Sequence, residues 1–228
     1  MRWGIIAAMD AELELILAAM QTEHVTKAYG VEFNIGRIGG SRVVAVCSSV
    51  GTINAAACAS VLAREMEVDA IVNIGVAGGA DSELDVLDVA VSSEVVFHDS
   101  QSEILVKYYP YRESFTADTG LIALAEQSIA GLPERGFNYK IGRIATGDVF
   151  VSDPALKAKI TAEHAPLCVE MEGAAIGQVA YMSGLPFLVI RSISDRSDVE
   201  AKVSFDQFLP RAAKNSAGIV LGMISLSG

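Results

Sequence analysis

The chain alternates between short, continuous apolar runs and stretches in which apolar side chains recur at helical spacing. A continuous apolar run is typical of a strand buried on both faces, whereas helical spacing predicts a helix with one buried side. Strands are therefore expected at residues 3–8, 31–38, 42–48, 70–75, 86–96, 139–145 and 186–192. Helices are expected at residues 10–20, 53–64, 118–129, 154–164, 173–182 and 204–225.

The order of these elements predicts the fold class. Strands alternate with helices, and the glycines at 39 and 40 predict a tight turn between two neighbouring strands. We therefore predict a three-layer α/β/α fold with a mixed central β-sheet, formed by a single domain over residues 1–228. Residues 100–117 are polar and aromatic, and we expect a long loop there, of the kind that serves function or an interface.

Residues suited to ligand binding follow several of the predicted strands. Glu12, Gly78, Glu172 and Asp195 each lie just beyond the end of an apolar run. Since α/β proteins bind ligands at the carboxyl ends of strands, we expect these four residues to meet at one edge of the sheet. Three carboxylates in one partly closed cleft would repel each other, so at least one should have a raised pKa. Asp10 is expected to cap the first helix.

The glycine-rich stretch at residues 75–79 follows a buried strand but lacks the G-x-G-x-x-G pattern. This disfavours a dinucleotide site. Glycines at a strand end instead allow a ligand such as a sugar to approach the backbone closely.

Composition and charge exclude several other classes of function. The 228 residues are 51% hydrophobic and carry a formal net charge of −11. That charge disfavours binding to nucleic acid and to anionic membrane surfaces. The three cysteines lack metal or disulfide spacing, the three histidines are far apart, and no apolar run suggests a signal peptide or membrane span. We expect a cytoplasmic protein without a metal ion.

Six segments occur in an order that is similar to a known family. They are GIIAAMDAE (4–12), NIGVAGG (73–79), TGDVFV (146–151), VEMEGA (169–174), RSISD (191–195) and SFDQF (204–208). Together they resemble the 5′-methylthioadenosine/S-adenosylhomocysteine nucleosidases of the purine nucleoside phosphorylase superfamily, over nearly the whole chain. The resemblance implies a homodimer without a cofactor that uses water to cleave the N-glycosidic bond of adenine thionucleosides, a step of methionine salvage.

The resemblance also assigns the reacting groups. It implies that Asp195 protonates N7 of adenine, with Ser194 and Arg191 in support, and that Glu12 activates the water. An acid for the leaving purine and a base for water, placed on either side of the sugar, is the general logic of inverting glycoside hydrolysis.

The remaining expected site residues bind substrate. Glu172 and the Met171 backbone are implied to hold the ribose hydroxyls, Phe150 to stack on adenine, the Val151 backbone to recognise the base edge, and Gly78 to lie beside the nucleoside. Met9, Val50 and Phe205 lie at element ends and are expected in the same apolar pocket. Val76 stands where many family members have serine. Residues 100–117 match the family poorly, which leaves the preferred 5′ substituent open.

Three alternatives remain open from the sequence. One is a phosphorolytic relative, although the first loop carries Asp10 and Glu12 and no arginine, which favours water over phosphate. A second is a hydrolase acting on aminofutalosine, which has the same adenine and ribose. A third is a nucleoside-binding protein without activity, because a fold does not fix a function.

Overall fold

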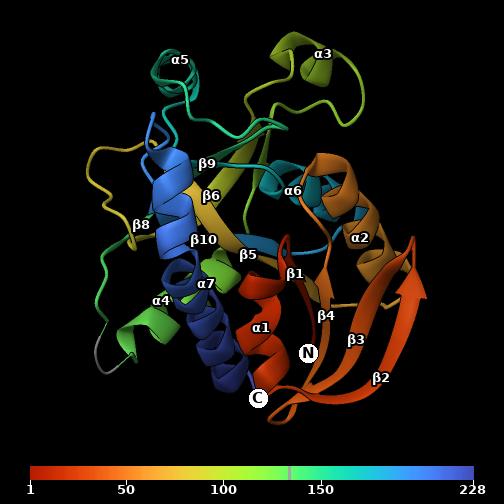
Figure 1. Ribbon diagram of the computed structural model, residues 1–228. Coiled ribbons are helices and arrows are strands. Elements are labelled where there is room, and N and C mark those ends of the chain that lie inside the picture. The colour runs from red at the N-terminus through yellow and green to blue at the C-terminus, as the bar shows by residue number, and fades with distance from the viewer. Residues whose placement is uncertain (133–134) are drawn as a thin grey trace.

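The computed structural model describes residues 1–132 and 135–228. In this part of the chain, ten strands form one mixed sheet with helices on both faces (Figure 1). The strands are β1 (Arg2–Ala7), β2 (Gln21–Ala28), β3 (Val31–Ile38), β4 (Ser41–Cys47), β5 (Ala70–Gly79), β6 (Val89–Phe97), β7 (Ser114–Thr116), β8 (Tyr139–Thr146), β9 (Cys168–Glu170) and β10 (Phe187–Asp195). The predicted α/β/α class with a mixed central sheet is confirmed.

The sheet curls back on itself at one end. Its strands follow the order β10-β6-β8-β9-β5-β1-β4-β3-β2, and β5 also pairs with β10, so five of the strands close into a ring. The strands β1, β4, β5 and β10 run parallel to one another, whereas β9 runs antiparallel to β5. The carboxyl ends of β1, β4, β5 and β10 therefore lie at the same edge of the sheet.

Helices cover the sheet in two groups (Figure 1). The helix α7 (Ala201–Leu226) packs on β5 and β10 and contacts α1 (Asp10–Ala19) and α4 (Thr119–Ala130). On the other side, α2 (Thr52–Arg64) packs against α6 (Gly173–Ser183). Two further helices, α3 (Ser102–Lys107) and α5 (Pro154–His164), lie near the ends of the ring strands.

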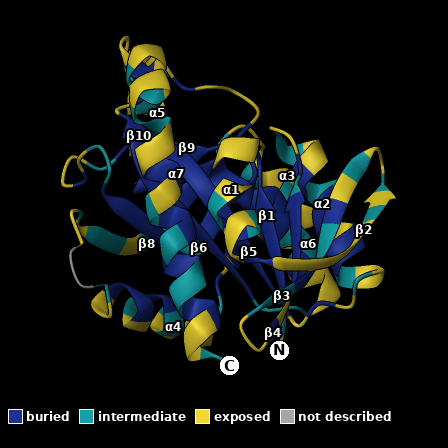
Figure 2. Ribbon diagram, turned by 60° about the horizontal axis from the view of Figure 1, so that its bottom comes forward, coloured by how far each residue is buried: buried dark blue, intermediate teal, exposed yellow. Residues whose placement is uncertain are grey.

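The apolar runs form the core, as the sequence predicts. The central strands are buried along nearly their whole length, and exposed residues gather on the outer sides of the helices and on β2 (Figure 2). The close approach of α6 to the sheet depends on Gly177, since a Cβ there would lie 2.7 Å from Val95 and 2.9 Å from Phe187. No helix in the described part of the chain is both long and apolar enough to cross a lipid bilayer.

The structure differs from the sequence predictions at several element boundaries. The strand β2 was not predicted, because most of its side chains are exposed and it has no apolar run. Asp10 is the first residue of α1, and the N-cap is Met9, so the expected cap at Asp10 is wrong. The final helix starts at Ala201, ahead of the expected start at Ser204. Residues 100–117 contain α3 and β7 and do not form one long loop.

Candidate active site

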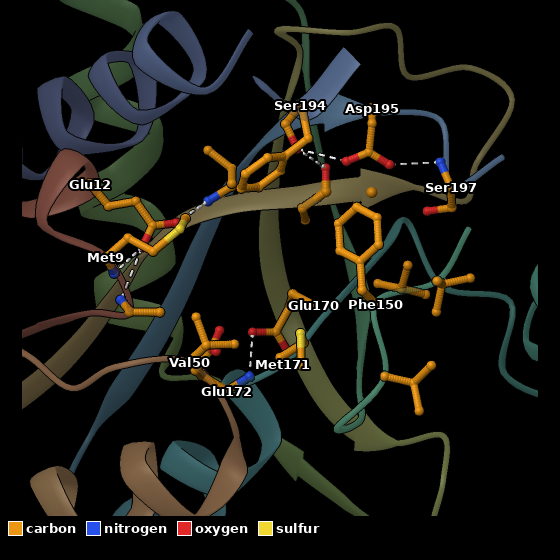
Figure 3. Close-up of a pocket in the computed structure, with 18 residues that line it drawn as sticks. Met9, Glu12, Val50, Phe150, Glu170, Met171, Glu172, Ser194, Asp195 and Ser197 are labelled. Carbon is orange, nitrogen blue, oxygen red and sulfur yellow. Dashed lines mark hydrogen bonds between the residues drawn. The ribbon is translucent and has the colours of Figure 1, made fainter. Parts of the chain in front are cut away.

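A single cleft at the open end of the ring collects nearly all of the residues singled out from the sequence. It encloses about 620 Å³ including its mouth, which suits a small organic ligand. Among the residues that line it are Met9, Glu12, Val50, Gly78, Phe150, Val151, Met171, Glu172, Ser194, Asp195 and Phe205 (Figure 3). The prediction that Glu12, Gly78, Glu172 and Asp195 lie close together is therefore confirmed. Arg191 is the one predicted site residue that does not line the cleft.

Glu12 is held rigidly in the first turn of α1. Its Oε2 accepts hydrogen bonds from the backbone N–H of Ala8 (3.0 Å) and Met9 (2.9 Å), and its Oε1 accepts one from Val76 (2.9 Å). The side chain is buried, and burial raises its pKa, while the guanidinium of Arg191 and the three backbone donors oppose the rise. A carboxylate with a raised pKa is a stronger base than an ordinary one, and its fixed position suits it to accept a proton from water.

Arg191 lies beneath the cleft, among the carboxylates. Its Nη2 donates to Glu170 Oε2, to Glu172 Oε2 (3.2 Å) and to Asn73 Oδ1 (2.6 Å), and its Nη1 donates to the backbone carbonyl of Ile74 (3.0 Å). The expected support of Asp195 by Arg191 is wrong, because the guanidinium is engaged by the two glutamates. A Cβ at Gly75 would overlap the guanidinium and the Glu12 carboxylate, so glycine is required where these groups cross the strand.

Glu170 anchors the start of α6 and was not predicted as a site residue. Its carboxylate accepts hydrogen bonds from the backbone N–H of Glu172 (3.0 Å) and Gly173 (2.8 Å) and from the hydroxyl of Thr146. An anion at a helix N-terminus satisfies free backbone donors and interacts favourably with the helix dipole. Glu170 thus fixes the backbone that carries Met171 and Glu172 into the cleft. The sequence signal for it was present, since a glutamate precedes a helix that opens with glycine.

Glu172 presents its carboxylate to the cleft from the N-cap of α6. Its Oε1 accepts a hydrogen bond from Gly51 N (2.9 Å), and burial raises its pKa to about 7, against the opposing effect of Arg191. The repulsion from Glu170 and Glu12 adds to this rise. The expected raised pKa is found for Glu172, for Glu12 and for Asp195, but burial is its largest cause at all three, and repulsion between the site carboxylates contributes only at Glu172.

This raised pKa predicts a pH dependence of stability. The folded protein holds the Glu172 proton up to about pH 7, whereas the unfolded chain releases it near the ordinary value of 4.5. The preference of the folded protein for the protonated Glu172 carboxyl therefore contributes its full stabilisation below pH 4.5. This contribution is lost as the pH rises through about 7. We expect the free energy of unfolding of the wild type, relative to Glu172→Gln, to fall by up to about 3 kcal/mol over that range. Urea denaturation at both ends of the range measures this, and a constant difference would contradict it.

Asp195 ends β10 on a different side of the cleft from Glu12 (Figure 3). Its Oδ2 accepts a hydrogen bond from Ser194 Oγ (2.8 Å) and its Oδ1 accepts one from the backbone N–H of Ser197 (2.8 Å). Burial raises the pKa of the carboxyl, against these two hydrogen bonds. Asp195 therefore keeps its proton to a higher pH than an ordinary aspartic acid, and the expected support from Ser194 takes the form of a direct hydrogen bond.

Aromatic and apolar side chains form the rest of the lining. Phe150 is 45% exposed and packs edge to face against Phe205, with 5.9 Å between the ring centres. Met9 and Val76 form a small apolar cluster with Phe205, Ala212 and Ala213 of α7. Ser197, which was not predicted, also lines the cleft. Within residues 1–132 and 135–228, no three His, Cys, Asp or Glu side chains are arranged to hold a metal ion.

Comparisons with known proteins agree with this geometry. The family model described as "Phosphorylase superfamily" matches residues 2–225. A 5′-methylthioadenosine/S-adenosylhomocysteine nucleosidase from Geobacillus thermodenitrificans is 38% identical, over 99% of this chain and 97% of the relative.

Solved structures extend the similarity to three dimensions. The corresponding Colwellia psychrerythraea nucleosidase, in complex with adenine, has a TM-score of 0.93 and 36% identity over 99% of this chain and 95% of that one. A Helicobacter pylori futalosine hydrolase mutant has a TM-score of 0.91 and 28% identity, over 99% of each chain. The chain belongs to the 5′-methylthioadenosine/S-adenosylhomocysteine nucleosidase family of the phosphorylase superfamily.

Proposed function

We propose that this protein hydrolyses the N-glycosidic bond of 5′-methylthioadenosine and S-adenosylhomocysteine, releasing adenine and the 5-thioribose product. The observation that carries the proposal is the placement of Glu12 and Asp195, two buried carboxyls with raised pKa values, on different sides of one apolar cleft. Departure of adenine leaves an oxocarbenium-like ribosyl cation, which nearby carboxylates stabilise. Asp195 protonates N7 of the leaving base, and Glu12 takes a proton from the attacking water.

The other lining residues hold the nucleoside in the proposed site. Glu172 and the Met171 backbone bind the ribose hydroxyls, and Gly78 lies beside the nucleoside. Phe150 stacks on adenine, whose edge meets the Val151 backbone. Met9, Val50 and Phe205 surround the 5′ substituent. Arg191 has a supporting role that differs from the one expected, because it positions Glu170 and Glu172 from below.

Water is favoured over phosphate as the nucleophile. Among the described residues that line the cleft there is no lysine or arginine, the side chains that would bind a phosphate. The nearby Arg191 directs both of its Nη atoms to protein acceptors. These observations support hydrolysis over the phosphorolytic alternative.

Adenine release is the experiment that tests the proposed function. The protein is incubated in phosphate-free buffer with methylthioadenosine, S-adenosylhomocysteine or aminofutalosine, and free adenine is measured. We expect release from the two thionucleosides. Preference for aminofutalosine would favour the menaquinone-precursor alternative, and binding without release would favour a nucleoside-binding protein. The higher identity to the thionucleoside relatives favours the first outcome.

We also propose that residues 1–228 form one domain that acts in the cytoplasm as a homodimer, within methionine salvage. Exposed apolar side chains on residues 100–117, α2 and α6 support the dimer; they are Ile53, Ile104, Val106, Tyr108, Tyr109, Tyr111, Tyr181 and Met182. The guanidinium of Arg112 lies 4.6 Å from the ring centre of Tyr181, which joins the 100–117 segment to α6. Interfaces are enriched in such aromatic and methionine side chains.

The dimer gives a prediction at Ile53, which is 81% exposed on α2. Ile53→Glu is expected to produce monomers, because a charge in the centre of an interface loses its water. Val25→Glu, on the exposed strand β2, is the matched control and is expected to leave the dimer intact. Light scattering on the eluting protein measures the mass of each. A wild type that is monomeric and fully active would contradict the proposal.

A further inference from the structure

The hydroxyl of Ser197 is buried at the cleft and has no partner in the described part of the protein. The residue is fully buried, and no described group donates to or accepts from its Oγ. The other buried side-chain atoms in this condition belong to Trp3, His98, Thr161 and Arg191, none of which lines the cleft. A buried hydroxyl without a hydrogen bond destabilises the folded state, so its presence at the binding cleft calls for a ligand that pairs with it.

The local backbone holds this hydroxyl in place. Ser197 has φ 51°, in the left-handed region that disfavours residues with a Cβ, and its N–H donates to Asp195 Oδ1 (2.8 Å). A Cβ on Gly78 would lie only 2.0 Å from Ser197 Oγ and 3.0 Å from Asp195 Oδ1. Gly78 therefore provides room for the serine hydroxyl and for the carboxyl of Asp195 together.

Ser197 and Asp195 consequently present neighbouring polar atoms to the same part of the cleft. Figure 3 shows them side by side, on the side of the cleft where the Phe150 ring lies. A hydroxyl both donates and accepts, so it can pair with a ring nitrogen or with an amino group. On a purine, N7 and the 6-amino group lie next to each other on one edge.

We infer that the Ser197 hydroxyl is a recognition group for the purine base, bonding the N7 and C6 edge beside the atom that Asp195 protonates. The inference rests on the proposed function, since it takes Asp195 as the acid for N7. It assigns Ser197 to binding and orientation of the base, and it explains why the structure keeps an unpaired hydroxyl on a strained backbone.

Ser197→Ala in the full-length protein tests this inference with two readouts. Removal of an unpaired hydroxyl should leave the unfolding temperature unchanged or raise it, because no internal hydrogen bond is lost. Adenine, titrated in a calorimeter, should bind about 3- to 10-fold more weakly, the effect of one neutral hydrogen bond.

The matched control is Ser128→Ala, which removes a buried hydroxyl outside the cleft. Ser128 Oγ donates to the carbonyl of Ile219 (2.7 Å), so this variant should unfold at lower temperature and bind adenine normally. The two serines should thus show opposite patterns of stability and affinity. Unchanged adenine affinity in Ser197→Ala, or a loss of stability like that of Ser128→Ala, would overturn the inference.

Two adenine analogues identify the contacted atom. Purine lacks the 6-amino group, and 7-deazaadenine lacks N7. The weakening caused by Ser197→Ala should disappear for the analogue that lacks the contacted atom, and an equal weakening with all three bases would overturn a direct contact. Failure of the proposed function would be a separate result, because the wild type would then release no adenine from methylthioadenosine. That result does not depend on how tightly Ser197→Ala binds the free base.

Discussion

Replacement of Asp195 by asparagine is expected to leave a folded protein whose turnover is reduced by roughly 100- to 10,000-fold, the usual effect of losing one general acid. Asparagine retains the shape and the local hydrogen bonds. Its Oδ1 can accept a hydrogen bond from Ser197 N, and its amide can donate one to Ser194 Oγ. Ser194 Oγ can then donate its own proton to the carbonyl of Ala77, 3.3 Å away. It cannot deliver a proton to N7. The loss should therefore fall on kcat, while a nucleoside analogue still binds.

Asp198→Asn is the control for disturbance of the same segment. Asp198 lies three residues further along, accepts a hydrogen bond from Glu200 N (3.0 Å) and does not line the cleft. Steady-state kinetics should show a far smaller loss for this variant, because it removes only a neighbouring charge that raises the Asp195 pKa and leaves the acid itself in place. Near-normal turnover in a folded Asp195→Asn protein would remove Asp195 from the mechanism.

Replacement of Arg191 by methionine is expected to lower the free energy of unfolding by about 3–5 kcal/mol. The guanidinium is fully buried and pairs with two buried glutamates. Methionine fills much of the same volume but leaves both carboxylates without their cation, and they must take up protons or remain charged without a partner. The difference in stability between this variant and the wild type should therefore become smaller as the pH falls, since protonation removes the unpaired charges.

The control for Arg191 is Arg196→Met, five residues along the chain. Arg196 pairs with Asp85 at the surface, where side-chain exposures of 59% and 74% leave both charges hydrated. Such pairs contribute about 0–1 kcal/mol, so this variant should unfold close to the wild type in urea. Equal stabilities of the two arginine variants would contradict the supporting role given to Arg191.

The sequence predicted the buried elements well because their signal is local. Continuous apolar runs identified most strands of the ring and the sheet, and Pro154 and Asp118 marked helix starts that the structure confirms. The exposed strand β2 has no such run, and it is held by pairing with β3 over its length. The closure of the ring was also beyond local patterns, because it depends on which distant strands pair.

The contrast between local signals and the pairing of distant segments also applies to the cleft. Glu12, Glu172 and Asp195 follow strand ends and lie in motifs, so their meeting at one cleft was predicted from the sequence. The two glutamates that pair with Arg191 were not predicted from the sequence, because strand order decides which carboxylates lie near its guanidinium. Ser197 carries no motif, and only the fold reveals that its hydroxyl is buried beside Asp195 without a partner.

The nature of the sugar product tests the central claim, cleavage of the N-glycosidic bond by water, most directly. Methylthioadenosine is turned over in phosphate buffer, adenine is quantified, and phosphorus NMR follows any sugar phosphate. The account predicts free methylthioribose in an amount equal to the adenine, a rate that does not depend on phosphate, and no new phosphorus signal. A sugar 1-phosphate that accumulates in step with adenine would contradict it.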